Sequence, residues 1–249
     1  MLWYDKCYYY WDNKYGCNIG FCRLCEFMCK ANDKLIVFSY AFEKFINHQK
    51  RIAISQAFDD EVFKSFSNTR LMKLMYCLCL ESLVVNDEVG DDDLVMADCN
   101  LFDFFGNFNA LPNGPVLLDI YRALDIIPGF KYEDGRFIGF DEETKITIPT
   151  RLDYIKTQIN QAFDRLMKNL SVSIFMDRDK LVSLTHKLPI WTKTFIYSIE
   201  KTMSTQEEDL KQEYIVYRQL QNKDQGGRLI SDLVAFFRIY MDMTTVAVG

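Results

Sequence analysis

The chain has 249 residues, of which 49% are hydrophobic and 26% are charged, and its formal net charge is −6. This composition excludes a disordered chain. The acidic balance, with a pI near 5.1, argues against a broad surface for nucleic-acid phosphates, although it leaves room for a local basic patch. Because no run of about 18 uninterrupted apolar residues occurs, we expect no membrane span. Aromatic residues make up 15% of the chain, more than a core of this size needs, which favours an aromatic interface.

The cysteines are concentrated at the start of the chain. Five of the eight lie within the first 29 residues, namely Cys7, Cys17, Cys22, Cys25 and Cys29. Cys22 and Cys25 have the two-residue gap that lets both thiolates reach one tetrahedral Zn²⁺, and the other three can supply further ligands. The same pair matches the C-x-x-C spacing of dithiol redox sites, in which a lowered thiol pKa makes the sulfur reactive. The cluster predicts either one bound zinc or a redox pair.

Core packing is the alternative interpretation of these thiols. Cys22, Cys25 and Cys29 fall at i, i+3 and i+7, on one face of a helix, and free cysteine packs like a small hydrophobe. Three thiolates on one face do not surround a tetrahedral ion unless Cys7 or Cys17 closes the site. The predicted cofactor is therefore none or a single zinc.

After the cysteines come three stretches in which apolar residues recur at helical spacing. Residues 34–49 carry one apolar stripe, made of Leu35, Phe38, Phe42, Phe45 and Ile46. Residues 51–66 have a similar amphipathic pattern. Residues 70–85 are apolar nearly all round, which predicts a helix that is capped by Asn68 or Thr69 and fully buried in the centre of the first half.

The stretch from residue 86 to residue 115 lacks helical or strand periodicity. Its acidic cluster at residues 87–93 matches neither a complete EF-hand loop nor the set of motifs that a polymerase needs, so we expect a solvated loop. Four phenylalanines follow, namely Phe102, Phe104, Phe105 and Phe108. They predict either a hydrophobic plug that docks this loop on the core or, if exposed, a partner-binding surface.

Asn113-Gly114-Pro115 is the clearest break in the chain. It divides a Cys- and aromatic-rich helical subdomain, residues 1–112, from a second helical subdomain, residues 113–249, and one continuous domain is the alternative. Proline suits the first turn of a helix, so we expect a helix over residues 115–127 that ends before Pro128-Gly129.

A small antiparallel hairpin is predicted over about residues 130–148. Asp134-Gly135 is a strong two-residue hairpin signal between Phe130–Tyr132 and Arg136–Phe140. A third strand is expected over residues 145–148. Such a small sheet has to pack on helices, so it is an insertion in a helical body.

Residues 150–186 combine a helix with a second candidate site. Thr150-x-x-Asp153 resembles a capping box and predicts a helix to about Asn169, whose inward residues are Leu152, Ile155, Ile159, Phe163 and Leu166. An apolar strand over residues 172–176 would then end in Asp177-x-Asp179, a pair that can hold a divalent metal in a transferase. Capping of the next helix by Asp177 is the simpler interpretation. No nucleophile motif accompanies His48 or His186.

The last third of the chain is predicted to be helical. We expect one helix over residues 190–203, and a second that begins with the capping box Ser204-x-x-Glu207. A final amphipathic helix over residues 228–243 carries an apolar side made of Leu229, Leu233, Phe236, Phe237 and Tyr240. That side either closes the core or serves as an oligomerisation surface.

These patterns together predict a mainly α protein with a small β-hairpin insertion. Because no complete catalytic constellation is present, the leading hypothesis is a non-enzymatic structural or protein–protein interaction protein that binds a protein partner or itself. The alternatives are a zinc-stabilised regulatory module, a thiol oxidoreductase and a metal-dependent transferase. Eight cysteines without a signal peptide favour a cytoplasmic or nuclear location. The abundance of Phe, Tyr, Met, Ile, Asn and Lys is typical of an AT-rich coding sequence, such as that of a large virus or an intracellular parasite.

Overall fold

The computed structural model describes residues 23–52, 62–63, 66–84, 96–97, 99–141, 143 and 146–224, without the side chains of residues 23–30 and 222–224. Its helices are α2 (Arg23–Ile52), α4 (Asn68–Glu81), α5 (Leu101–Phe105), α6 (Leu118–Tyr121), α7 (Asp153–Asn169), α8 (Val172–Met176), α9 (Arg178–His186), α10 (Pro189–Tyr197) and α11 (Glu207–Asp224). Its strands are β1 (Asn109–Leu111), β2 (Gly114–Val116), β3 (Phe130–Glu133) and β4 (Arg136–Phe140). The predicted mainly α fold with a small hairpin insertion is confirmed.

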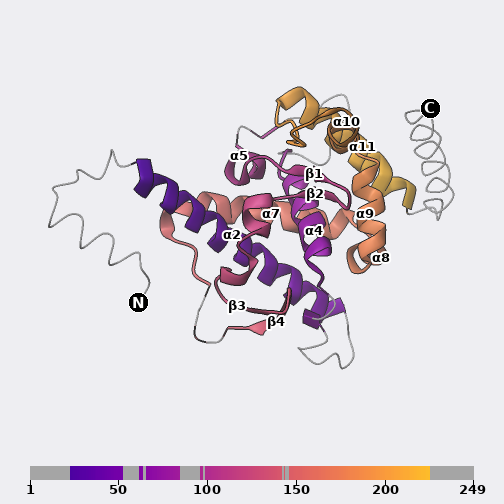
Figure 1. Ribbon diagram of the computed structural model, residues 1–249. Helices are drawn as coiled ribbons and strands as arrows, with labels where there is room; N and C mark the ends of the chain where they lie inside the picture. Colours follow the sequence, from indigo (N-terminus) through magenta and orange to yellow (C-terminus); the bar gives the residue numbers. More distant parts are fainter. Residues whose placement is uncertain are drawn as a thin grey trace.

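Helix α4 lies at the centre of the described helices (Figure 1). Every side chain from Arg70 to Glu81 is buried, and the helix packs against α7, α9, α11 and β2. The prediction of a fully buried helix at this position is confirmed. Its N-cap is Ser67, one residue before the predicted Asn68, and the Ser67 hydroxyl accepts a hydrogen bond from Arg70 N at 3.2 Å. Since α4 packs on elements from beyond residue 113, both halves of the chain contribute to one hydrophobic core.

Helix α2 carries the predicted apolar stripe into this core. Phe38, Phe42, Phe45 and Ile46 are fully buried, and Leu35 is half-buried against them. The ring of Phe42 lies 4.4 Å from Phe130 of β3 and 4.6 Å from Phe137 of β4, measured between ring centroids. A two-stranded hairpin is only marginally stable alone, so these aromatic contacts with α2 hold β3 and β4 in place.

The β3–β4 hairpin forms where Asp134-Gly135 predicts it. Both turn residues have positive φ angles, 49° at Asp134 and 77° at Gly135, as a type I′ turn requires. The strands pair from Glu133 with Arg136 to Phe130 with Phe140. The predicted third strand is wrong for its described part, because residues 146–148 belong to no strand.

A second hairpin, β1–β2, occupies the position of the predicted break and of the start of the predicted helix over residues 115–127. Pro115 pairs with Ala110 in this hairpin, and its carbonyl accepts a hydrogen bond from Lys73 Nζ at 2.7 Å. The extended backbone of this strand pairing excludes a helix that begins at Pro115. The helical prediction is wrong over most of its length, and only α6 and a 3₁₀ turn, Leu124–Ile126, remain of it.

Substitution of Gly114 by alanine is expected to destabilise the protein by about 1–3 kcal/mol. Gly114 has a φ of +99°, and an added Cβ would lie 2.6 Å from Lys73 Cε and 2.8 Å from Thr185 Oγ1. Gly135→Ala is the matched control, because its φ is +77° but nothing lies within 4 Å of the added Cβ. Urea unfolding should show the larger loss for Gly114→Ala, and equal losses would contradict this account of the packing.

Of three further predicted elements, one has the predicted extent, one is a helix instead of a strand and one is shorter than predicted. Helix α7 runs to Asn169 with the predicted residues inward, although it follows a 3₁₀ turn, Thr150–Leu152, and its N-cap has no side-chain hydrogen bond. Residues 172–176 form helix α8 rather than a strand, because Ser171 Oγ caps them by accepting from Ile174 N at 3.4 Å. The predicted helix over residues 190–203 is too long, because α10 ends at Tyr197.

Several predicted features lie outside the described residues. These are the acidic cluster at residues 87–93, most of the predicted helix over residues 51–66 and the helix over residues 228–243. None of the helices in the described ranges combines the length and the apolarity needed to span a bilayer.

Candidate functional site

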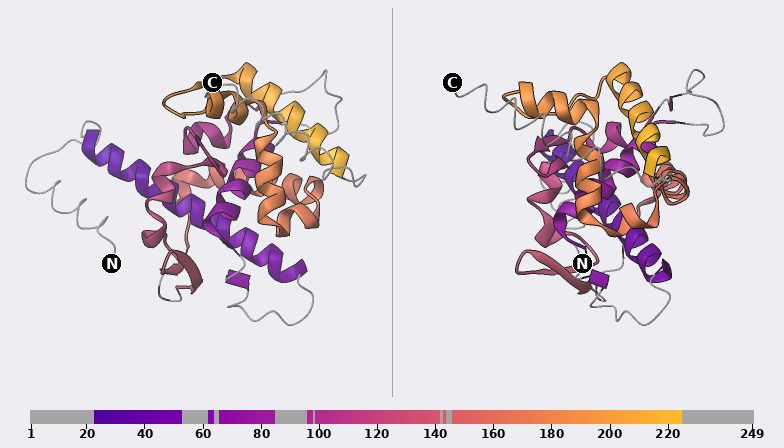
Figure 2. Two further views of the ribbon diagram at one scale, coloured as in Figure 1. Left: turned by 45° about the vertical axis from the view of Figure 1, so that its right-hand side comes forward. Right: turned by 90° about the vertical axis from the view of Figure 1, so that its right-hand side faces the viewer.

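The candidate site is a groove at the end of the molecule formed by α10 and α11. Figure 1 shows these two helices at the opposite end from the β3–β4 hairpin, and both views of Figure 2 agree. The groove has a volume of ≈ 320 Å³, at the lower end of the range of ligand sites in proteins. Its walls are α10, the connection that follows it and the first turns of α11. The lining residues are Pro189, Ile190, Lys193, Thr194, Tyr197, Ser198, Thr202, Ser204, Asp209 and Gln212.

The connection between α10 and α11 is held by backbone hydrogen bonds. Ser198 N closes the last turn of α10 by donating to Thr194 O at 3.0 Å. Further on, Ala110 N of β1 donates to Lys201 O at 2.7 Å, and Met203 N donates to Phe108 O at 2.8 Å. These two bonds form an antiparallel bridge between Thr202 and Asn109, which is incompatible with a helix that continues to residue 203.

Three large apolar side chains are exposed beside the groove. Ile199 is 97% exposed, Tyr197 is 73% exposed and Ile196 is 37% exposed. We name this group the 196–199 ridge. Ser198 N and Lys201 O are both hydrogen-bonded, so the backbone is anchored one residue before Ile199 and two residues after it.

Glu213 of α11 lies behind the groove and joins three helices. Its Oε1 accepts a hydrogen bond from Tyr76 Oη of α4 at 2.5 Å, and its Oε2 accepts one from Ile190 N, in the first turn of α10, at 2.7 Å. Burial raises the pKa of Glu213 to about 7, while these two hydrogen bonds act to lower it. This carboxyl group sets the position of α10 against α11 and so determines the shape of the groove.

The inner face of α10 packs on β1 and α9. The Trp191 ring stacks on His186 with 3.9 Å between centroids, and Trp191 Nε1 donates to Leu111 O at 3.1 Å. Burial lowers the pKa of His186 to about 4, and the nearby Lys73 contributes to this lowering. His186 is therefore a neutral packing partner at pH 7.

Helix α4 presents a row of buried polar and ionisable side chains, which the apolar pattern of residues 70–85 had concealed. The row consists of Arg70, Lys73, Tyr76, Cys77 and Glu81, each no more than 1% exposed. Arg70 Nε donates to Phe175 O at 2.9 Å, and Lys73 Nζ donates to Pro115 O. Burial lowers the pKa of Lys73 to about 7. None of these side chains lines the groove. Arg70 joins α4 to α8, and Lys73 joins α4 to β2.

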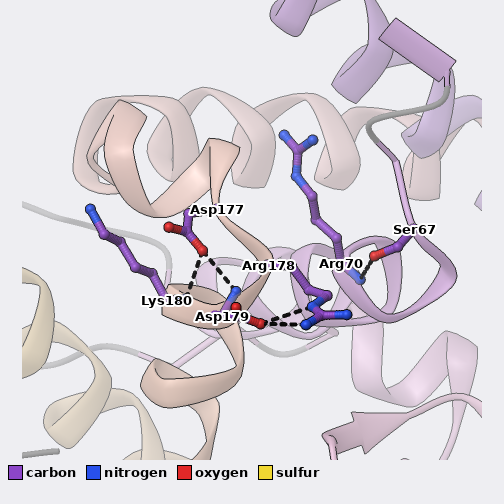
Figure 3. A network of polar contacts seen from close by, with 6 residues as sticks. All are labelled: Ser67, Arg70, Asp177, Arg178, Asp179 and Lys180. Atoms are coloured by element: carbon purple, nitrogen blue, oxygen red, sulfur yellow. Dashed lines mark hydrogen bonds and ion pairs between the residues drawn. The ribbon is translucent and has the colours of Figure 1, made fainter. Parts of the chain in front are cut away.

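Asp177 and Asp179 do not converge on a common point (Figure 3). Asp177 Oδ1 accepts from Asp179 N at 2.8 Å and from Lys180 N at 3.2 Å, which makes it the N-cap of α9. Asp179 Oδ1 forms an ion pair with the guanidinium of Arg178 at 2.8 Å. Among the described residues, no group of three or more His, Cys, Asp or Glu side chains is placed to hold a metal ion.

Removal of the Asp177 carboxylate tests its capping role. Asp177→Ala is expected to lower the free energy of unfolding by about 1 kcal/mol, because two amides at the start of α9 lose their acceptor. Asp179→Ala removes only an exposed ion pair and should cost no more than a few tenths of a kcal/mol. Thermal unfolding of both variants checks this order, and a larger loss for Asp179→Ala would contradict it.

The other predicted site residues fall into two groups. Cys7, Cys17 and Cys22 lie outside the described residues, as do the side chains of Cys25 and Cys29 and the whole apolar side made of Leu233, Phe236, Phe237 and Tyr240. Phe102, Phe105 and Phe108 are buried in the core, and Phe104 is half-buried against it. Tyr76 contacts Phe102 and Phe108 edge to face, with centroid distances of 5.8 Å and 4.9 Å. This arrangement is that of a plug docked on the core.

Sequence patterns did not indicate the groove or the 196–199 ridge. Apolar residues at positions 196, 197 and 199 are as compatible with a buried helix face as with exposure, and no glycine or proline marks the end of α10. The serines and threonines between residues 198 and 205 were the only local signal of an irregular segment. No known protein family, no curated protein and no solved structure matches this chain.

Proposed function

We propose that this protein is a non-enzymatic protein–protein interaction protein whose binding surface is the α10–α11 groove together with the 196–199 ridge. The observation that carries the proposal is the exposure of Ile199 and Tyr197 in a segment whose backbone is hydrogen-bonded at Ser198 and at Lys201. An aliphatic side chain gains about 1.5–3 kcal/mol when it is fully buried, so the ridge offers a partner a substantial source of binding energy.

The backbone hydrogen bonds around the ridge support binding. Association costs free energy whenever flexible side chains and loops become ordered at the interface. The bonds from Ser198 N to Thr194 O and from Met203 N to Phe108 O order this segment before any partner arrives. The adjacent groove supplies a concave surface of the kind in which the strongest contacts of protein interfaces are found.

The placement of the titratable residues favours binding over catalysis at this face. Lys73, His186 and Glu213, three of the groups whose pKa values are strongly shifted, lie beneath the surface, and none of them lines the groove. Among the residues that the structure describes, no histidine or cysteine lines the groove. A groove with these walls offers apolar contact and hydroxyl hydrogen bonds, which suit recognition of a protein surface.

Photo-crosslinking tests the proposal even though the partner is unidentified. A photo-reactive amino acid at position 199 is expected to give a defined covalent protein adduct, which mass spectrometry identifies, and the adduct should disappear when Tyr197→Ser is added. The control carries the same amino acid at position 172, which is 52% exposed in the native protein but lies on α8. No adduct at position 199 beyond that at position 172 would overturn the proposed function.

A further inference from the structure

We infer that the partner of the α10–α11 face is a second copy of this chain, bound around a two-fold axis with the 196–199 ridge of each copy in the groove of the other. This inference rests on the proposed function and specifies its partner.

The ridge and the groove lie side by side on one face, as this arrangement requires. In a two-fold symmetric dimer the same patch of both subunits meets itself, so the patch has to contain both a protrusion and a complementary hollow. Tyr197 belongs to both, because it lines the groove and is 73% exposed, and Ile199 protrudes two residues further on.

The charges of the groove are also self-complementary. Lys193 lines the groove from α10 and Asp209 lines it from α11. Neither side chain forms an ion pair within the part of the chain that the structure describes. A two-fold rotation that exchanges the two helices brings Lys193 of each copy towards Asp209 of the other. This pairing matters because each chain carries a net charge of −6, and two copies otherwise repel each other.

The size of the patch indicates a weak dimer. Three exposed apolar side chains are few for a specific interface, so we expect a contact at the small end of the range of interface sizes. We expect a dissociation constant on the order of 1–100 μM, so that monomer and dimer coexist at ordinary protein concentrations.

Sedimentation velocity of the full-length chain tests the inference. Wild-type protein should pass from the 29.3 kDa monomer to twice that mass as its concentration rises through the micromolar range. Ile199→Asp should weaken the dimer at least about tenfold, because a charge replaces a central apolar contact. Val172→Asp, on the exposed surface of α8, should leave it unchanged, and both variants should keep the wild-type circular dichroism spectrum.

Reversing the charges at positions 193 and 209 makes the test specific for a two-fold symmetric dimer. Lys193→Asp and Asp209→Lys should each weaken the dimer, since each variant pairs like charges with itself. An equal mixture of the two variants should restore it, because every contact then joins opposite charges. A protein that stays monomeric to about 300 μM, or a dimer that responds to neither Ile199→Asp nor the charge exchange, overturns the inference. A monomeric protein that gives an adduct with another protein at position 199 overturns self-association alone and leaves the proposed function standing.

Discussion

Glu213→Ala is expected to lower the free energy of unfolding by about 3–5 kcal/mol. The substitution removes the acceptor of both Tyr76 Oη and Ile190 N, and both donors are left inside the protein without that partner. It also opens a cavity between α4, α10 and α11. Urea unfolding measures the loss, and dimerisation should fail in the same variant because α10 no longer has its fixed position against α11.

Glu213→Gln is the matched control for this prediction. The amide keeps the shape of the side chain, its oxygen can accept from Ile190 N, and its nitrogen can donate to Tyr76 Oη. We therefore expect a loss of only about 1 kcal/mol. If the glutamine and alanine variants were equally unstable, the hydrogen bonds of Glu213 would not be what holds α10.

The raised pKa of Glu213 predicts that the stability of the protein depends on pH. Burial raises the pKa of Glu213 from 4.5 in its ordinary state to about 7 in the folded protein. Between these pH values the folded protein binds a proton that the unfolded chain has released. The contribution of Glu213 to stability is thus fully present below about pH 4.5 and decreases towards pH 7, by at most about 1.4 kcal/mol per pH unit.

The contribution of His186 to stability changes with pH in the opposite direction over part of this range. Its pKa is lowered from 6.5 to about 4, so its contribution rises with pH between these values. The difference in stability between wild type and Glu213→Gln cancels the histidine contribution and isolates the carboxyl group. A difference that stays constant from pH 4.5 to pH 7 would contradict the raised pKa of Glu213.

Phe42→Ala is expected to destabilise the protein by about 3–5 kcal/mol, the usual cost of removing a fully buried phenylalanine. Its ring contacts Phe66 at 5.5 Å and both strands of the β3–β4 hairpin, through Phe130 and Phe137. The hairpin therefore loses its main attachment to α2, and its amides should exchange with solvent faster. Urea unfolding and hydrogen exchange measure the two effects.

Phe104→Ala provides the comparison. Phe104 is half-buried against the core and contacts Phe105, with 5.2 Å between ring centroids. Removal of a half-buried ring should cost less than half as much as removal of a fully buried one. A loss at position 104 as large as that at position 42 would show that the packing around α2 is not as described.

The parts of the fold that could be predicted depend on local or periodic signals. The burial stripe of α7 follows from residues three and four positions apart on one helix face, and the β3–β4 turn follows from the φ angles that Asp134-Gly135 tolerates. The central position of α4 follows from a segment that is apolar nearly all round. In each case the residues that specify the element lie within it.

The wrong predictions involve hydrogen bonds between distant residues. A segment with good helical spacing starts as a strand, because Pro115 pairs with Ala110 of β1, and Lys73 bonds the Pro115 carbonyl from 42 residues away. Phe108 and Ala110 likewise bond the backbone at residues 201–203 and end α10 early. No pattern within residues 115–127 or 190–203 indicates these hydrogen bonds to distant residues.

The candidate site depends on the second of these long-range effects. Ile199 is exposed because the chain turns away from α10 at Ser198 and is held by β1, and an uninterrupted helix would have given it a different environment. The two walls of the groove likewise come together because Glu213 bonds the start of α10. The site could not be predicted without the tertiary structure.

Hydrogen–deuterium exchange at two protein concentrations tests the interface most directly. We would compare the wild-type chain at about 2 μM and about 200 μM, on either side of the expected dissociation constant. The account predicts slower exchange at the higher concentration in peptides that cover residues 189–212, and unchanged exchange in α7 and in the β3–β4 hairpin. Protection that is absent at residues 189–212, or that appears on a different face, would contradict a dimer formed through the α10–α11 groove and the 196–199 ridge.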